Sequence, residues 1–280
     1  MSKQLRRTTQ WKDSNLGSIR KGESLNKDKP QSRYGRIEGM IDIESWARKR
    51  VTLIGLGSMG QPISSQLARH GVATRPPGRI RLIDGDIVSP RNLIGTEYRL
   101  HHLNRPKAIA ASEIIAEINH DVSVSYWHRS IKDDDVPHIV KMATMSDLLG
   151  LFADSFDLMM EISDRCYDIC PQVMALFGPG ADYAEVAFSI PGATCRISET
   201  IGKRKRKTIS KPTALGCDTA HISNFVASVC MRILLGEAQN TLLVPCYSNA
   251  SLLIVGLRSS WIFRNQPRDI LRTVVCVQTK

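Results

Sequence analysis

The chain has 280 residues and a formal net charge of +11, and 42% of its residues are hydrophobic, which is ordinary for a soluble globular domain. The surplus positive charge lies in two segments. Residues 1–32 hold eight basic and three acidic residues, and residues 203–211, KRKRKTISK, hold six basic residues. The remainder is neutral, which excludes a uniformly cationic architectural protein and predicts a neutral body with two basic attachments.

Neither a membrane protein nor a disulfide-stapled one fits the sequence. No apolar run approaches the roughly 20 residues that cross a bilayer, and the polar amino terminus lacks the apolar stretch of a signal peptide. The seven cysteines form no C-x-x-C pair, so we expect reduced thiols and no structural zinc. The sequence therefore predicts a cytoplasmic protein without a membrane partner.

The first half of the chain alternates strands and helices. Residues 1–32 are too polar to build a core, and we expect a disordered basic tail there. Beyond it, short apolar runs predict strands and segments with helical spacing predict helices. The strands are Val51–Leu56, Arg79–Asp84, Val122–Tyr126 and Phe156–Glu161, and the helices are Pro62–His70, Pro106–Asn119 and Val136–Leu151.

The second half changes character. Further strands are predicted at Tyr183–Ser189 and Thr194–Glu199, followed by a loop over 203–211, a long helix over Ala214–Leu235, and a closing antiparallel pair, Leu252–Leu257 with Trp261–Arg264. The whole pattern indicates an α/β fold, a Rossmann-like twisted and mainly parallel sheet with helices on both faces and antiparallel strands in the C-terminal half. Residues 33–280 are expected to form a single domain.

A glycine-rich turn, Gly55-Leu-Gly57-Ser-Met-Gly60, lies between the first predicted strand and its helix. In that context G-x-G-x-x-G binds phosphate, because the backbone can approach the ligand and the helix amino terminus attracts the anion. Residues 51–71, VTLIGLGSMGQPISSQLARHG, are similar to the opening of the 3-hydroxyisobutyrate dehydrogenase group. That resemblance implies an NAD(P)-dependent dehydrogenase in which Asp84 binds a ribose hydroxyl.

Beyond residue 80 the chain resembles the adenylyltransferase family of ThiF, MoeB and the ubiquitin-activating enzymes. The motifs that carry the resemblance are residues 82–93, similar to D-x-D-x-V-x-x-x-N-L; 104–108, similar to G-x-x-K-A; 118–124, similar to I-N-P-x-V-x-V; 156–164, similar to D-L-V-x-D-x-T-D-N; 33–36, similar to R-Y-S-R; and 215–236, similar to a late helix ending in L-L-G. The dehydrogenase interpretation does not explain Asn92, Lys107 and Asp164 together.

The second resemblance implies an enzyme that uses ATP and Mg²⁺ to adenylate the C-terminal carboxylate of a ubiquitin-like or sulfur-carrier protein. By motif position, Gly55, Gly57 and Gly60 face the phosphates, Asp84 binds the ribose, Lys107 and Asn92 contact phosphate oxygens, Asp164 holds Mg²⁺, and Arg36 reaches the nucleotide of a second subunit in a homodimer. Asp86 is either a ligand or a turn-stabilising residue. The basic stretch at about 200–213 corresponds to the family's crossover loop.

The chain departs from the family at several positions. The family's N-L-x-R arginine is replaced by Gly95, with Arg91 and Arg99 as nearby cations, and Arg165 follows Asp164 where the family has asparagine. A catalytically degenerate ATP-binding scaffold is therefore an alternative.

Cys195, which flanks the basic stretch, is a candidate for a reactive thiol, with burial in the core as the other interpretation. Nucleic acid could bind only through the basic tail and loop, which could equally be solvated or contact an acidic partner.

Overall fold

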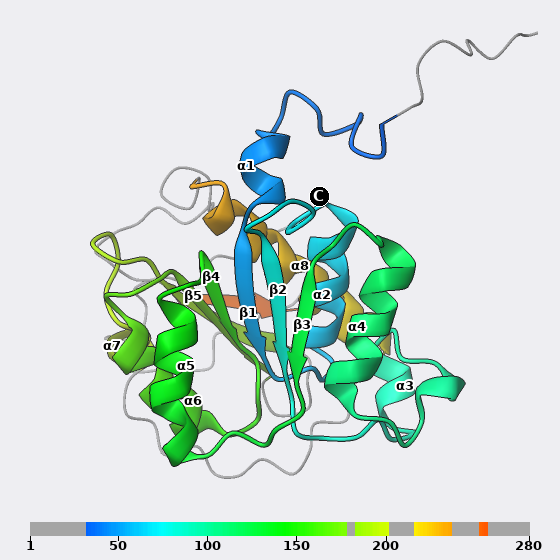
Figure 1. The fold of residues 1–280 in the computed structure, drawn as a ribbon. Coiled ribbons are helices and arrows are strands. Elements are labelled where there is room, and N and C mark those ends of the chain that lie inside the picture. The colour runs from blue at the N-terminus through cyan, green and yellow to red at the C-terminus, as the bar shows by residue number, and fades with distance from the viewer. Residues whose placement is uncertain (1–31, 178–182, 202–215, 237–251, 257–280) are drawn as a thin grey trace, which may run out of the picture. The chain divides into compact units, whose positions relative to one another are not determined.

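The structure, a computed structural model, describes residues 32–177, 183–201, 216–236 and 252–256 (Figure 1). The chain divides into two compact units, residues 1–36 and residues 37–280, and the fold below is that of the larger unit. The basic loop over 203–211, the expected strand Trp261–Arg264 and all of the predicted tail except Ser32 lie outside the described residues.

A sheet in the order β3-β2-β1-β4-β5-β6-β7 forms the centre of the described part. The strands are β1 (Arg50–Ile54), β2 (Arg79–Ile83), β3 (Val124–Trp127), β4 (Leu148–Leu151), β5 (Gln172–Phe177), β6 (Tyr183–Ser189) and β7 (Leu252–Gly256). β1 to β5 are mutually parallel, whereas β6 pairs antiparallel with both β5 and β7. The predicted fold class is confirmed.

Helices cover both faces of the sheet (Figure 1). One face packs against α2 (Gly60–Arg69), α4 (Lys107–Ile118) and α8 (Gly216–Leu234), and the other against α5 (Val136–Ala143), α6 (Phe156–Cys166) and α7 (Ile197–Ile201). Short helices complete the described part: α1 (Ile43–Ala47), α3 (Asn92–Gly95), η1 (Leu100–His102) and η2 (Asp133–Asp135).

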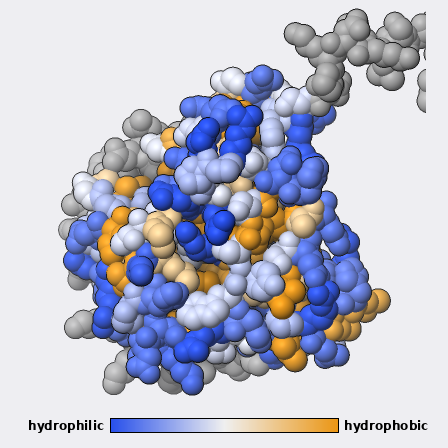
Figure 2. Space-filling view, viewed as in Figure 1, coloured by the Kyte–Doolittle hydropathy of each residue, from blue (hydrophilic) through white to orange (hydrophobic). Residues whose placement is uncertain are grey.

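The strand side chains alternate between the two cores. Val51 and Leu53 of β1 pack on the α2 side, whereas Ile54 packs on the α6 side. The side of the molecule seen in Figure 2 is mostly hydrophilic, with smaller groups of hydrophobic residues between the polar ones. None of the helices among the described residues has the length and apolar character that a membrane crossing requires.

Two predicted strands are wrong, and two strands of the sheet, β4 and β5, were not predicted as strands. Phe156–Glu161 belongs to helix α6, because Met159, Ile162 and Cys166 recur at helical spacing and are buried together. The fourth parallel strand is instead β4, whose residues were assigned to the end of the preceding helix. The predicted strand Thr194–Glu199 is a short loop followed by the first residues of helix α7. No strand was predicted at the position of β5.

Candidate functional site

The strand order predicts a ligand crevice between β1 and β4. From β1 the chain moves outward to β2 and β3, and then returns to β4 on the other side of β1. At such a switch point the loops that leave neighbouring strands diverge, and open α/β sheets bind their ligands there, outside the carboxyl ends of the strands. The glycine turn follows β1 directly, and Asp154 follows β4 by three residues.

The three glycines of the turn have different surroundings. Gly55 has φ +88°, and a Cβ on it would lie 2.5 Å from the Ala153 backbone nitrogen, so this position packs the turn against the end of β4. A Cβ on Gly60 would collide with the carbonyl oxygen of Gly55. A Cβ on Gly57 would meet no atom within 4 Å. Gly57 is therefore where the backbone leaves room for a ligand.

Asp84 follows β2 and supports the turn from the side. Its carboxylate accepts hydrogen bonds from the backbone N–H groups of Leu56, at 2.6 Å, and Asp86, at 2.7 Å. Burial raises the pKa of Asp84, and the opposing effects of the nearby Lys107 ammonium and of these two hydrogen bonds are smaller. Asp84 therefore combines a structural bond to the turn with acceptor capacity for a ligand hydroxyl.

Lys107, the first residue of α4, is fixed beside Asp84. Its side chain is only 8% exposed, and Nζ donates to Oδ2 of Asp86 at 2.7 Å. The Lys107 backbone N–H also donates to the Asp86 carbonyl oxygen. Asp86 thus accepts hydrogen bonds from both the side chain and the backbone of Lys107. These bonds favour a role for Asp86 in anchoring Lys107 over a role as a ligand-binding residue.

Asn92 begins α3, and Gly95 ends it. The Oδ1 atom of Asn92 accepts hydrogen bonds from the N–H and the hydroxyl of Ser89, both at 2.9 Å, which orients the amide so that its NH₂ faces the other way. A Cβ on Gly95 would lie 2.7 Å from Ser58 Oγ in the glycine turn and 3.0 Å from Thr219 Oγ1 in α8. The short helix therefore contacts the turn closely.

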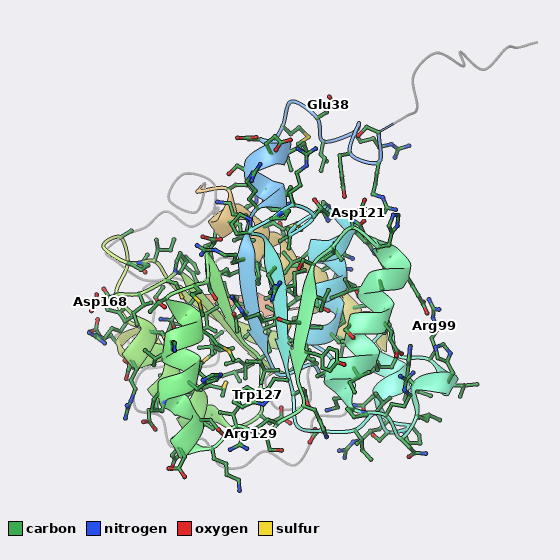
Figure 3. The ribbon with its side chains drawn as sticks, in the orientation of Figure 1. Glu38, Arg99, Asp121, Trp127, Arg129 and Asp168 are labelled. Atoms are coloured by element: carbon green, nitrogen blue, oxygen red, sulfur yellow. The ribbon has the colours of Figure 1, made fainter. Side chains whose placement is uncertain are left out.

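The end of β3 lies beside the end of β2. The Asp84 N–H donates to the Trp127 carbonyl oxygen, and the Arg129 N–H donates to the Asp84 carbonyl oxygen. Both residues lie where β3 ends (Figure 3), with the Arg129 guanidinium 5.6 Å from the Trp127 ring centroid. Arg99 instead pairs with Glu117 of α4 at 2.7 Å, pointing outward in Figure 3, so it does not supply a cation to the turn.

Asp164 lies elsewhere, and its predicted position at the end of a strand is wrong. It belongs to the last turn of α6, and the carbonyl of its neighbour Ser163 accepts a hydrogen bond from Gln172, the first residue of β5. This is the edge where the parallel strands begin, opposite the glycine turn. There Ser198 donates to the Asp164 carboxylate at 2.5 Å and Arg196 to its carbonyl oxygen at 2.8 Å, so Asp164 anchors α7.

Cys195 precedes Arg196 directly and lies at that same edge. The structure therefore does not bring the candidate thiol together with the glycine turn. Arg36 belongs to the smaller unit, of which the turn over residues 32–36 is described, and its predicted reach into a second subunit stays a prediction.

The carboxylate that the structure brings to the crevice is Asp154, which the sequence reasoning missed. It is exposed and follows the backbone of Ala153, against which Gly55 packs. The signal was present, because Asp147-Leu148 to Asp154 has the same spacing of D-L and a later Asp as residues 157–164. No cluster of three or more metal-ligating side chains occurs among the described residues. Mg²⁺ commonly takes one or two carboxylates together with phosphate oxygens, and Asp154 fits that donor set.

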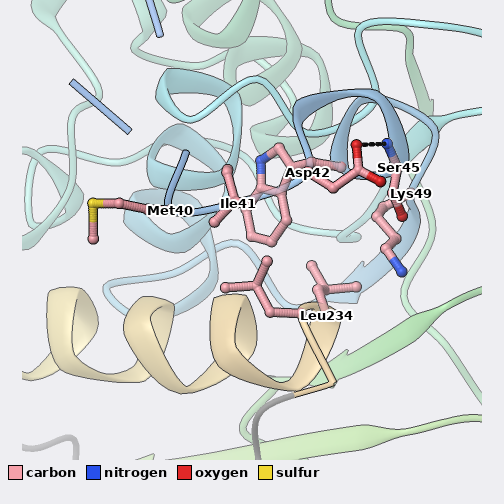
Figure 4. Close-up of a pocket in the computed structure, with 8 residues that line it drawn as sticks. Met40, Ile41, Asp42, Ser45, Lys49 and Leu234 are labelled. Carbon is pink, nitrogen blue, oxygen red and sulfur yellow. Dashed lines mark hydrogen bonds between the residues drawn. The ribbon is translucent and has the colours of Figure 1, made fainter. Parts of the chain in front are cut away.

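A cavity of about 210 Å³ lies apart from this crevice, between the segment around α1 and the end of α8 (Figure 4). Because α1 precedes β1, the cavity is at the edge where the strands begin. It is lined by Met40, Ile41, Asp42, Ser45, Trp46, Lys49, Leu234 and Leu235. None of the predicted site residues is among them.

Comparisons with known proteins agree with this architecture. The model of the ThiF family matches residues 31–254. The chain is 29% identical over 140 residues to the adenylyltransferase and sulfurtransferase UBA4 of Yarrowia lipolytica, covering 47% of this chain and 30% of that protein. It is 30% identical over 105 residues to ubiquitin-like modifier-activating enzyme 5 of Arabidopsis thaliana, covering 36% and 23%.

Among solved structures, E. coli MccB with ATP superposes with a TM-score of 0.62 at 20% identity, over 74% of this chain and 65% of that one. The structural likeness supports the fold. The chain spans less than a third of the length of the curated relatives it matches.

Proposed function

Because the chain belongs to the ThiF family, we propose that it is an ATP-dependent adenylyltransferase that activates the C-terminal carboxylate of a ubiquitin-like or sulfur-carrier protein as an acyl-adenylate. One observation carries the proposal. The open backbone at Gly57 lies at the switch-point crevice, with Asp84 and the buried Lys107 beside it and Asp154 across it.

Each of these groups suits one part of ATP. The phosphates approach the backbone at Gly57, where no side chain intervenes, and the adjacent amino terminus of α2 attracts negative charge. The Asp84 carboxylate accepts hydrogen bonds from ribose hydroxyls, and the Asn92 amide donates to phosphate oxygens. Lys107, held by Asp86, offers a fixed positive charge at the same edge.

The reaction joins an oxygen of the partner's carboxylate to the α-phosphorus of ATP and releases pyrophosphate. Its transition state accumulates negative charge on phosphate oxygens, which preorganised donors and cations stabilise. The Lys107 ammonium is preorganised in this sense, because it is fixed by a 2.7 Å bond. Asp154 would hold Mg²⁺ through a carboxylate oxygen, and the bound ion would neutralise charge on the departing phosphates.

The remaining features of the proposal concern partners. We propose a homodimer in which Arg36 contacts the nucleotide of the partner subunit, and a cytoplasmic location. The basic loop over 203–211 would contact the incoming carrier protein. Its flanks support this role, since Ile201 ends α7 at one edge of the sheet and Gly216 begins α8 against Ile94 at the edge of the glycine turn.

ATP–pyrophosphate exchange tests the proposed function. The purified chain is incubated with ATP, Mg²⁺ and labelled pyrophosphate, with and without small carrier proteins that end in Gly-Gly. We expect label to enter ATP only when an accepted carrier is present. ATP binding without exchange, for every carrier, would instead favour the scaffold alternative, and tight NADPH binding without ATP binding would favour the dehydrogenase.

A further inference from the structure

A buried tyrosine joins the glycine turn to the helix that carries Lys107. Tyr98 lies between α3 and η1 and is 4% exposed. Its hydroxyl is 2.9 Å from the carbonyl oxygen of Leu56, inside the glycine turn, and 3.3 Å from the carbonyl oxygen of Lys107. The shorter bond is to the turn. One phenol therefore contacts both elements that face the phosphates.

The bond to Leu56 fixes the direction of the next peptide N–H. The Leu56 N–H donates to Asp84 at 2.6 Å, while its carbonyl accepts from Tyr98, so both polar groups of this residue are fixed. In a planar trans peptide the C=O and the following N–H point in opposite directions. Because the Leu56 carbonyl points to the buried Tyr98, the Gly57 N–H points away from it.

Tyr98 is itself held firmly. Its backbone N–H donates to Thr96 Oγ1 at 3.2 Å, and the adjacent Glu97 N–H donates to Gln61 of α2 at 2.6 Å. The ring meets the His102 ring edge-on at 6.2 Å. Burial, followed by the nearby carboxylates of Asp84 and Asp86, raises the pKa of the phenol, so the hydroxyl remains a donor at all physiological pH values.

We propose that Tyr98 is a positioning residue for nucleotide binding, which aims the Gly57 N–H at the phosphates through its hydrogen bond to the Leu56 carbonyl and holds the start of α4 beside the turn through its contact with the Lys107 carbonyl. Tyr98 itself does not touch the ligand. This inference rests on the proposed function, since it assumes that phosphates bind at the glycine turn.

Phosphate-dependent affinity is the measurement that separates positioning from simple stabilisation. Tyr98→Phe removes one oxygen atom and keeps the ring. We expect its Kd for ATP to rise about tenfold, because a peptide released from this bond adopts the ligand-facing orientation in only about a tenth of the molecules, and its Kd for adenosine to stay within about twofold. Binding is measured by titration of ATP and by competition of adenosine against a fluorescent ATP analogue, and thermal unfolding is recorded for each protein.

Tyr167→Phe is the matched control, since the Tyr167 hydroxyl also donates to a backbone carbonyl, that of Thr194 at 2.6 Å, but at the opposite edge of the sheet. It should leave both Kd values unchanged. If Tyr98→Phe leaves the ATP affinity at the wild-type value, or weakens ATP and adenosine by the same factor, the positioning role is overturned while ATP binding stands. If the wild-type protein binds no ATP, the proposed function fails and the role of Tyr98 fails with it.

Discussion

Replacing Gly57 by alanine should separate ligand binding from folding. The φ angle of Gly57 lies outside the left-handed region, and the added methyl group would meet no protein atom within 4 Å. Because alanine has fewer unfolded conformations than glycine, we expect a change in the free energy of unfolding of about 0 to +1 kcal/mol, in the stabilising direction. The same methyl group would occupy the space through which a phosphate approaches the backbone.

Gly60 provides the contrasting substitution. A Cβ there would collide with the Gly55 carbonyl oxygen, so Gly60→Ala must shift the turn or the start of α2. Overpacking of this kind costs about 1–3 kcal/mol, which corresponds to a fall in Tm of roughly 2 to 12 °C for a chain of this size. Gly55→Ala adds the strain of a left-handed φ for a residue with a side chain, about 1–2 kcal/mol.

The assay pairs thermal unfolding with ATP titration for the three variants. Gly57→Ala should unfold at or slightly above the wild-type Tm and bind ATP at least tenfold more weakly, a loss of about 1.4 kcal/mol. Gly60→Ala and Gly55→Ala should unfold at a lower Tm than the wild type. If Gly57→Ala folds normally and binds ATP as the wild type does, the phosphates do not lie over the turn, and the argument from its open backbone is refuted.

The other predictions use the charged groups around the crevice. Asp154→Asn should lower the rate of pyrophosphate exchange at least a hundredfold at saturating ATP and raise the Mg²⁺ concentration needed for half-maximal rate, because it removes the proposed metal ligand. Asp164→Asn should change the rate less than threefold and lower the Tm, because it weakens the bond that anchors α7. Lys107→Met should weaken ATP at least tenfold but change the free energy of unfolding by less than about 1 kcal/mol, since the Asp86 carboxylate left behind is 64% exposed and stays hydrated. Burial raises the pKa of Asp84, so on acidification this carboxyl takes up its proton before an ordinary aspartate does. ATP affinity measured from pH 7 down to pH 4 should therefore fall more steeply in the wild type than in Asp84→Asn, and parallel profiles would exclude Asp84 as the titrating acceptor.

Local signals were sufficient for the half of the fold that carries the glycine turn. β1 is mostly apolar, β2 places one apolar residue between two arginines and ends in Leu-Ile, and α2 and α4 have buried residues at helical spacing, so each element could be identified without its neighbours. The positions of the glycine turn and of Asp84 at the ends of β1 and β2 could be predicted for the same reason, since each follows its strand directly in the sequence.

The error at β4 shows that local sequence patterns do not distinguish every strand from a helix. A buried strand of four apolar residues has no periodicity that distinguishes it from the end of a helix. The chain also carries two runs with D-L followed by an aspartate at the same spacing, beginning at Asp147 and Asp157. The second run matches the family letters better, but it lies in helix α6, whereas the first run contains β4 and its last residue, Asp154, follows that strand. Tertiary pairing of β4 with β1 and β5 decides between them.

The contacts that position the site could not have been found from the sequence. Tyr98 bonds to Leu56 across 42 positions and Glu97 to Gln61 across 36, and neither pair has a spacing that signals contact. Such bonds arise because α3 and η1 fold back over the turn, a result of packing and not of any local preference. Sequence motifs therefore located the ligand-facing groups, while the residues that orient them became visible only in the fold.

The same packing explains the departure at Gly95. A side chain there would press on Ser58 and Thr219, and a Cβ on Gly216 would collide with the Ile94 carbonyl oxygen, so both glycines are needed for α3 and α8 to approach this closely. An arginine at position 95 would have to separate the two helices. The missing charge is thus coupled to a closer contact between α3, α8 and the glycine turn. Lys107 is a fixed cation beside that turn. If one fixed cation with Mg²⁺ suffices for adenylation, exchange will occur with Gly95 in place; if it does not, the closed junction is the physical reason that the chain binds ATP without turning it over.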